Sequence, residues 1–140
     1  MLSAKEREIA RQVKSVRPLR PAHVVVAGLD PRLLKTVAVL LSHAGCEVVS
    51  VRGFGGLLEA AVAHGAHVAV LDGSHGPRAA ARAAERLRAL EPPVPVLVLT
   101  RDTAAPALRD LTVLPKWDRL EDLADEVNQL YLAGAPVRGR

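Results

Sequence analysis

Five apolar segments recur along the chain, and none shows the regular apolar and polar alternation of a strand with one face in water. The first reads His-Val-Val-Val-Ala and begins at His23. Runs of β-branched residues like this one are typical of strands buried on both faces of a parallel sheet. The five predicted strands cover residues 23–27, 47–51, 67–71, 94–99 and 111–114.

Helical periodicity fills the gaps between these strands. The predicted helices cover residues 31–43, 54–64, 77–90 and 119–132. Between the last two strands, residues 104–109 predict only a short or missing helix, because Pro106 lacks an N–H donor and its ring clashes with a preceding turn. Strands that alternate with helices predict an α/β fold, with a doubly wound, five-stranded parallel sheet in a flavodoxin-like three-layer sandwich.

The N-terminal segment, residues 1–22, is predicted to be a separate basic arm. Ser3 and Glu6 make a capping-box pattern, so residues 3–16 are expected to form an extra helix that ends before Pro18. The segment holds six Lys or Arg residues against two Glu residues, and so carries the whole net charge of +4. Such an arm is either a solvated helix face or a surface for an acidic partner, nucleic acid or anionic lipid.

The length, the cysteine content and the apolar runs limit the class of protein to which the chain can belong. A length of 140 residues predicts one domain, at 23–133, followed by a flexible tail at 134–140. The single cysteine, Cys46, excludes an intrachain disulfide and a thiolate zinc site. No apolar run reaches the ~20 residues of a membrane span and the N-terminus has no apolar signal stretch, so the expected location is cytoplasmic.

Four polar side chains lie at or just after the carboxyl ends of predicted strands. They are Asp30, Asp72, Thr100 and Lys116. Ligands of open parallel sheets bind at this edge, where the strand order reverses. A carboxylate, a hydroxyl and an ammonium that converge there can hold a phosphoryl group and its charge, and an aspartate can itself accept one.

In their order along the chain these residues resemble the receiver domain of bacterial response regulators. The resemblance covers residues 23–133, with the third strand leading into Asp72, the fourth into Thr100 and the fifth into Lys116. It implies that Asp72 is the phosphoacceptor, that Thr100 hydrogen-bonds the phosphoryl group and that Lys116 pairs with its charge. It also implies a phosphohistidine on a sensor kinase as the donor and Mg²⁺ as the cofactor.

The metal site departs from that family. Receivers place an acidic pair after the first strand to hold Mg²⁺, and here Gly28 and Leu29 stand at those positions. Asp30 follows and precedes Pro31, so Asp30 is either a helix cap or a displaced metal ligand. A magnesium site would then rest on Asp30 and Asp72 at most.

Arg101 is a second departure, because it follows the strand-four hydroxyl where the family has a small residue. A long cation at this position either blocks the site by pairing with Asp72 or points into solvent. Without the acidic pair, phosphotransfer loses its main electrostatic stabilisation. The sequence therefore favours an atypical receiver, or pseudo-receiver, that does not depend on phosphorylation.

The favoured hypothesis is a stand-alone, non-enzymatic signalling module of the two-component type that acts through protein contacts. Its expected partner is a sensor kinase or a downstream effector, and homodimer formation stays open. A conventional phosphorylation switch at Asp72 and a small flavodoxin-like ligand-binding protein are the alternatives.

Two groups of basic side chains lie outside this site. Three arginines share one face of the predicted helix 77–90 and form either a solvated face or a surface for an acidic partner: Arg78, Arg82 and Arg86. No aromatic residue accompanies them, which argues against nucleic-acid binding. Three histidines lack metal-ligand spacing and fall on different predicted elements: His64, His67 and His75.

Overall fold

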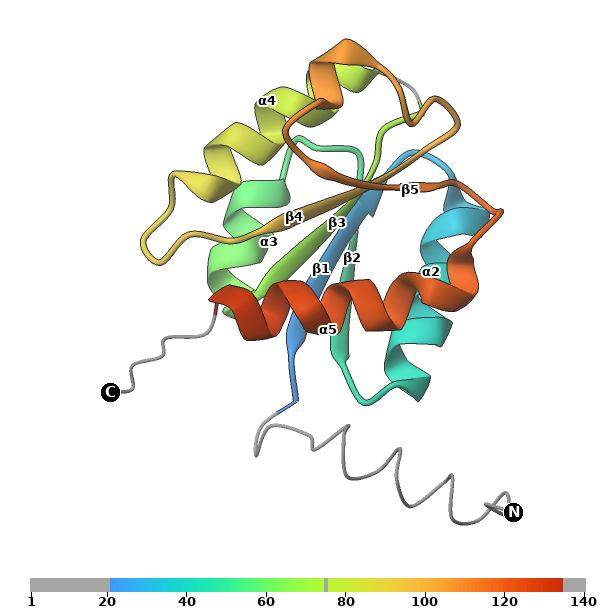
Figure 1. Ribbon diagram of the computed structural model, residues 1–140. Helices are drawn as coiled ribbons and strands as arrows, with labels where there is room; N and C mark the ends of the chain where they lie inside the picture. Colours follow the sequence, from blue (N-terminus) through green and yellow to red (C-terminus); the bar gives the residue numbers. More distant parts are fainter. Residues whose placement is uncertain (1–20, 75, 135–140) are drawn as a thin grey trace, which may run out of the picture.

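The computed structural model describes residues 21–74 and 76–134. Five strands form a single parallel sheet in the order β2-β1-β3-β4-β5, which confirms the predicted doubly wound sheet (Figure 1). The strands are β1 (His23–Gly28), β2 (Glu47–Arg52), β3 (Val68–Asp72), β4 (Val96–Thr100) and β5 (Thr112–Pro115). The predicted N-terminal helix at 3–16 and residues 135–140 lie outside the described residues.

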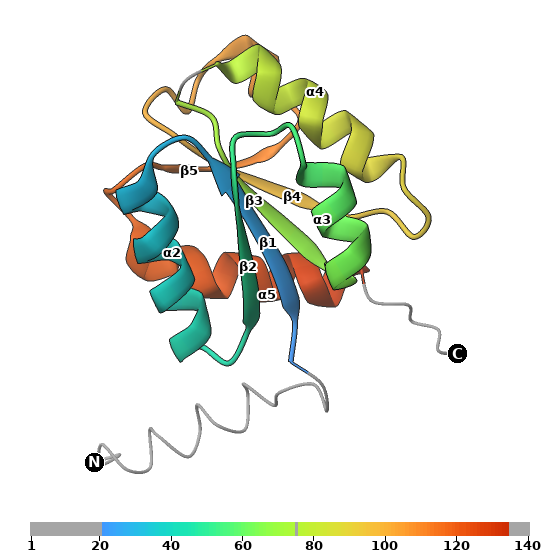
Figure 2. The ribbon, with the colours of Figure 1, turned by 180° about the vertical axis from the view of Figure 1, so that it is seen from behind.

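Helices cover both faces of this sheet. The α-helices are α2 (Pro31–His43), α3 (Leu57–His64), α4 (Pro77–Arg88) and α5 (Leu123–Gly134), and two 3₁₀ turns are η1 (Pro106–Leu108) and η2 (Leu120–Asp122). Figures 1 and 2 show α2 and α5 on one face of the sheet and α3 and α4 on the other. The three-layer sandwich is therefore confirmed. Separately, none of the described helices is long and apolar enough to cross a membrane.

Alternate residues of the central strands pack into two separate cores. In β1, Val24 and Val26 join the core under α2 and α5, whereas Val25 and Ala27 join the core under α3 and α4. Every residue of β3 and β4 is buried. This burial on both faces explains why the strand sequences are continuous apolar runs without alternation.

The bounds of several elements differ from the predictions, among them those of β4, α3 and α5. β4 begins at Val96 because the N–H of Val94 donates to the carbonyl of Leu87 at 3.0 Å, at the end of α4, and Pro95 has no N–H to donate. α3 begins only at Leu57, since glycines at the two preceding positions disfavour helix. α5 spans Leu123–Gly134, so it begins later and ends later than the predicted helix 119–132.

The connection between β4 and β5 is the unusual one. Each of the other crossovers contains an α-helix of 8 to 13 residues, but this one contains only the three-residue turn η1. The predicted short or missing helix is therefore confirmed. Pro106 stands at the first position of η1, where a missing N–H does no harm.

Candidate functional site

The carboxyl ends of the strands meet at one edge of the sheet. Because β1 lies between β2 and β3, the strand order reverses there. β3 ends at Asp72 and β4 at Thr100, while Lys116 directly follows β5. The N–H of Lys116 donates to the carbonyl of Thr100 at 2.8 Å and extends the pairing of β5 with β4. The residues predicted from the sequence thus share the edge at which ligands of open α/β sheets bind.

Lys116 lies between two carboxylates. Its Nζ atom is 3.3 Å from Oδ2 of Asp72 and 3.2 Å from Oδ2 of Asp30. The side chain of Lys116 is 2% exposed and that of Asp72 is 1% exposed. A buried charge is very costly unless it is paired, so the ammonium and the two carboxylates depend on one another. The cluster joins the end of β3, the start of α2 and the segment after β5.

The two carboxylate oxygens of Asp30 make different contacts. Its Oδ1 atom accepts from the backbone N–H of Arg32 at 3.0 Å and of Leu33 at 3.4 Å, which caps α2, while Oδ2 faces Lys116. Partial desolvation acts to raise the pKa of Asp30, but the Lys116 hydrogen bond and the two backbone amides outweigh it and lower the pKa below its ordinary value. The structure therefore supports the helix-cap interpretation of Asp30, with an ion pair in addition.

Gly28 makes room for Asp72. A Cβ atom added at Gly28 would lie 2.6 Å from the Cβ atom of Asp72, which is closer than two non-bonded carbon atoms normally approach. No acidic side chain fits at position 28 unless Asp72 moves. The next residue, Leu29, is 54% exposed and brings no charge. Gly28 therefore brings no side chain to this edge, and Asp72 occupies the space beside it.

The hydroxyl of Thr100 is used within its own turn. Thr100 is buried, and its Oγ1 atom accepts from the backbone N–H of Asp102 at 3.1 Å. Arg101 is exposed and, within the part of the chain that the structure describes, forms no ion pair. The blocking contact between Arg101 and Asp72 considered from the sequence is therefore not formed in this structure. Lys116 holds Asp72 instead.

Ser74 completes the surroundings of Asp72. Its backbone N–H donates to Oδ1 of Asp72 at 3.0 Å, while its own Oγ atom is buried without a hydrogen-bond partner in the described residues. Beside Asp72 lies a small cavity of about 120 Å³, lined also by Gly28, Leu29 and Phe54. Among the described residues that line it, Asp72 carries the charge. The one sequence signal for the Ser74 contact is its position two residues after Asp72.

Trp117 marks the rim of the site. Its backbone φ angle is 74°, in the left-handed region that side chains other than glycine rarely adopt. The guanidinium carbon of Arg32 lies 5.9 Å from the centre of the indole ring, within the range of a cation–π contact. A left-handed backbone directly after Lys116 fixes the direction in which the chain leaves β5.

At this edge the described residues offer a metal ion two carboxylates, those of Asp30 and Asp72. Mg²⁺ requires oxygen ligands in near-octahedral geometry and is held by carboxylates. Here both carboxylates point an oxygen at the same ammonium, and Gly28 brings no side chain. In the described residues no group of three or more His, Cys, Asp or Glu side chains is placed to bind a metal ion.

The histidines lie at the opposite edge of the sheet. The backbone N–H of His23 donates to Nδ1 of His67 at 2.9 Å, and the His23 ring stacks on His64 with 4.9 Å between centroids. His67 also packs against Tyr131. The sequence pattern did not indicate that His23 belongs with these histidines. His75 lies outside the described residues. Since ring contacts and backbone hydrogen bonds occupy these side chains, they join the starts of β1 and β3 to α3.

The arrangement of the sheet, its helices and the strand-end residues is that of the receiver fold. No protein-family model matches the chain, and no curated protein matches it. Many solved structures share the fold, and those described below are receiver domains or response regulators. The similarity lies in the three-dimensional structure, because the sequence identities are low.

Three of these structures illustrate the match. The receiver domain of the putative response regulator NarL from Mycobacterium tuberculosis is 24% identical, with a TM-score of 0.69 over 81% of this chain and 98% of that one. The chemotaxis protein CheY4 from Vibrio cholerae is 19% identical, with a TM-score of 0.69 over 79% and 98%. The response regulator TrrA from Thermotoga maritima, in complex with Mg²⁺-BeF, is 14% identical, with a TM-score of 0.67 over 78% and 98%.

Proposed function

We propose that this chain is a pseudo-receiver, a receiver-fold signalling module that binds a partner protein without requiring phosphorylation of Asp72. Its partner would be a signalling protein such as a sensor kinase or a downstream effector, and a second copy of the chain is a further candidate. In this proposal the domain presents a surface and does not turn over a substrate.

The observation that carries the proposal is the shortage of acidic groups at this edge, since Gly28 and Leu29 bring none and the carboxylates of Asp30 and Asp72 both face Lys116. The Lys116 ammonium lies 3.2 Å from Asp30 and 3.3 Å from Asp72, and so supplies within the chain the positive charge that a metal ion would bring. The second oxygen of Asp72 accepts from the backbone N–H of Ser74. Phosphotransfer to Asp72 would have to release one of these oxygens and would lack the cation that stabilises the transferred group.

A conventional phosphorylation switch is the second candidate. Asp72, Thr100 and Lys116 lie at the ends of three neighbouring strands, which is the favourable observation for it. In that case Lys116 would leave Asp30 and pair with the phosphoryl group, and Mg²⁺ would be held by Asp30 and Asp72. The two candidates differ in whether the site accepts a metal ion together with a phosphoryl group.

Beryllofluoride, a mimic of the phosphoryl group, separates them. A ligand that binds the folded state raises the midpoint of thermal unfolding by mass action. We expect no shift for this chain when Mg²⁺ and beryllofluoride are added together. TrrA, whose structure contains Mg²⁺-BeF, serves as the positive control. A shift that requires both additions and disappears in Asp72→Asn would contradict the pseudo-receiver and establish the switch.

A further inference from the structure

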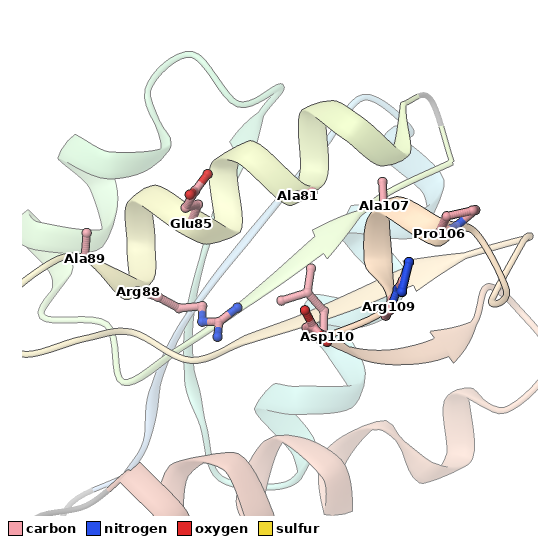
Figure 3. Close-up of a pocket in the computed structure, with 9 residues that line it drawn as sticks. Ala81, Glu85, Arg88, Ala89, Pro106, Ala107, Arg109 and Asp110 are labelled. Carbon is pink, nitrogen blue, oxygen red and sulfur yellow. The ribbon is translucent and has the colours of Figure 1, made fainter.

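Two hollows of the domain differ in the chemistry of their walls. The larger, of about 690 Å³, lies between α4 and the segment from η1 to β5 (Figure 3). Its charged lining residues are two arginines and two acids, Arg88, Arg109, Glu85 and Asp110, so its charge favours neither a cation nor an anion. The smaller, of about 120 Å³, lies beside Asp72 and has mostly apolar walls. We call the smaller one the Phe54 cavity.

The Phe54 cavity lies where four segments meet at the carboxyl edge of the sheet. They are the ends of β1, β2 and β3 with the residues that follow them, and the first turn of α4, which contribute Gly28, Leu29, Gly53, Phe54, Asp72 and Ala79. The strand order reverses here, because β1 lies between β2 and β3. Small molecules bind to open α/β sheets at such a point. The cavity therefore has the position of a ligand site.

Apolar groups form most of its wall. The side chains of Leu29, Phe54 and Ala79 line it, and at Gly28 and Gly53 the backbone itself does so. The Cδ2 atom of Leu29 would lie 3.6 Å from a Cβ atom added at Gly53, so Leu29 lies close to the end of β2. Leu29 is nevertheless exposed. A ligand in the cavity would take part of this side chain out of water, which favours binding.

Asp72 is the charged residue among the described residues of the lining, but its carboxylate already has partners. Its Oδ2 atom lies 3.3 Å from Nζ of Lys116, and its Oδ1 atom accepts from the backbone N–H of Ser74 at 3.0 Å. The side chain is buried. A cationic ligand would have to compete with Lys116, whereas an apolar ligand leaves both contacts in place. The walls thus select an apolar group.

The volume of the cavity limits the size of the ligand. At about 120 Å³ it is well below the roughly 300–1,000 Å³ of pockets that hold drug-sized molecules, so it is too small to enclose a flavin or a nucleotide. It is close to the size of an apolar cavity of about 150 Å³ that holds benzene. A single aromatic ring or a short branched hydrocarbon therefore fits.

We propose that the Phe54 cavity binds a small apolar molecule about the size of one aromatic ring, between Leu29, Phe54 and Ala79 and beside the ion pair of Asp72. This site goes beyond the proposed adaptor function and does not depend on it. A bound molecule would contact the ends of β1 and β2 and the first turn of α4 at the same time.

Benzene and pyrimidine, two neutral rings of similar size and different polarity, test the proposal by NMR titration of the full chain. We expect benzene to shift the methyl resonances of Leu29 and Ala79 in a saturable manner. Pyrimidine should bind roughly tenfold more weakly or worse, because its ring nitrogens would lose hydrogen bonds to water in an apolar site. No saturable shift with benzene, or equal affinities for the two rings, would overturn the inference.

Three variants locate the bound ring. Ala79→Leu fills the cavity, and we expect the affinity for benzene to fall roughly tenfold or more. Ala81→Leu is the matched control, since it makes the same change in α4 but Ala81 lines the larger hollow (Figure 3), and it should bind benzene as the native chain does. Leu29→Ser removes an apolar wall at an exposed position and should also weaken binding.

Circular dichroism checks that each variant is folded. Leu29→Ser keeps the test valid if Ala79→Leu fails to fold, because a change at an exposed position ordinarily has little effect on stability. If the folded variants at positions 29 and 79 bind benzene as tightly as the native chain, the ring lies elsewhere and the proposed site is wrong.

Discussion

Lys116 and Asp72 form a buried ion pair, with 3.3 Å between Nζ and Oδ2, at the edge of the sheet where receiver-fold proteins place their chemistry. The same ammonium also holds Asp30, which caps α2. The cluster thus links one ammonium to two carboxylates. Its energetics lead to predictions that can be measured on the purified chain.

Lys116→Met leaves Asp72 buried without its cation. We expect a loss of roughly 3–5 kcal/mol in the free energy of unfolding, the usual cost of removing one partner of a buried ion pair. The double variant Lys116→Met with Asp72→Asn should recover most of that loss, because it removes both charges. Urea denaturation of the native chain, of Lys116→Met, of Asp72→Asn and of the double variant gives the coupling energy between the two side chains. Equal losses in the single and double variants would show that the ion pair does not stabilise the site.

Gly28→Asp tests whether an acidic residue can simply be restored. Its Cβ atom would lie 2.6 Å from the Cβ atom of Asp72, so we expect destabilisation of about 1–3 kcal/mol from overpacking. The free energy of unfolding of the variant should be no larger with Mg²⁺ than without it. Leu29→Asp, at an exposed position, is the matched control and should have little effect on stability. Strong stabilisation of Gly28→Asp by Mg²⁺ would contradict the steric argument.

The lowered pKa of Asp30 leads to a pH dependence of the free energy of unfolding. Because its folded-state pKa lies below the ordinary value of 3.8, the charged carboxylate stabilises the folded chain at higher pH. That contribution is lost as the pH falls through the folded-state pKa. The stability difference between the native chain and Asp30→Asn should therefore be constant from neutral pH down to the ordinary pKa and should shrink in more acidic solution. A difference that stays constant throughout the acidic range would argue against the Lys116 and amide contacts.

Two strand ends were predictable from the sequence because the apolar runs 67–71 and 94–99 finish directly at Asp72 and Thr100, while Lys116 comes one residue after the run 111–114 and Pro115. Asp72, Thr100 and Lys116 follow from that pattern together with the edge rule for parallel sheets. The short β4–β5 connection was also predictable, since Pro106 marks it.

The pairing of Lys116 with Asp30 was not predictable, because it depends on how close the end of β5 comes to the start of α2. The contact of Gly28 with Asp72 requires knowledge that β1 and β3 are neighbours, with Ala27 beside Leu71. Nothing local in the sequence fixes either relationship. The left-handed backbone of Trp117 likewise has no sequence signature, since glycine is the residue that ordinarily marks such a position.

The central claim is that Lys116 takes the place of a metal ion and leaves Asp72 unphosphorylated. Intact-protein mass spectrometry after incubation with Mg²⁺ and a small phosphodonor such as acetyl phosphate tests it directly, with Asp72→Asn as the control and TrrA as a comparison. We predict a single unmodified mass for both the native chain and the variant. A phosphoryl adduct on the native chain that is absent from Asp72→Asn would contradict the claim and assign the chain to the phosphorylated switches.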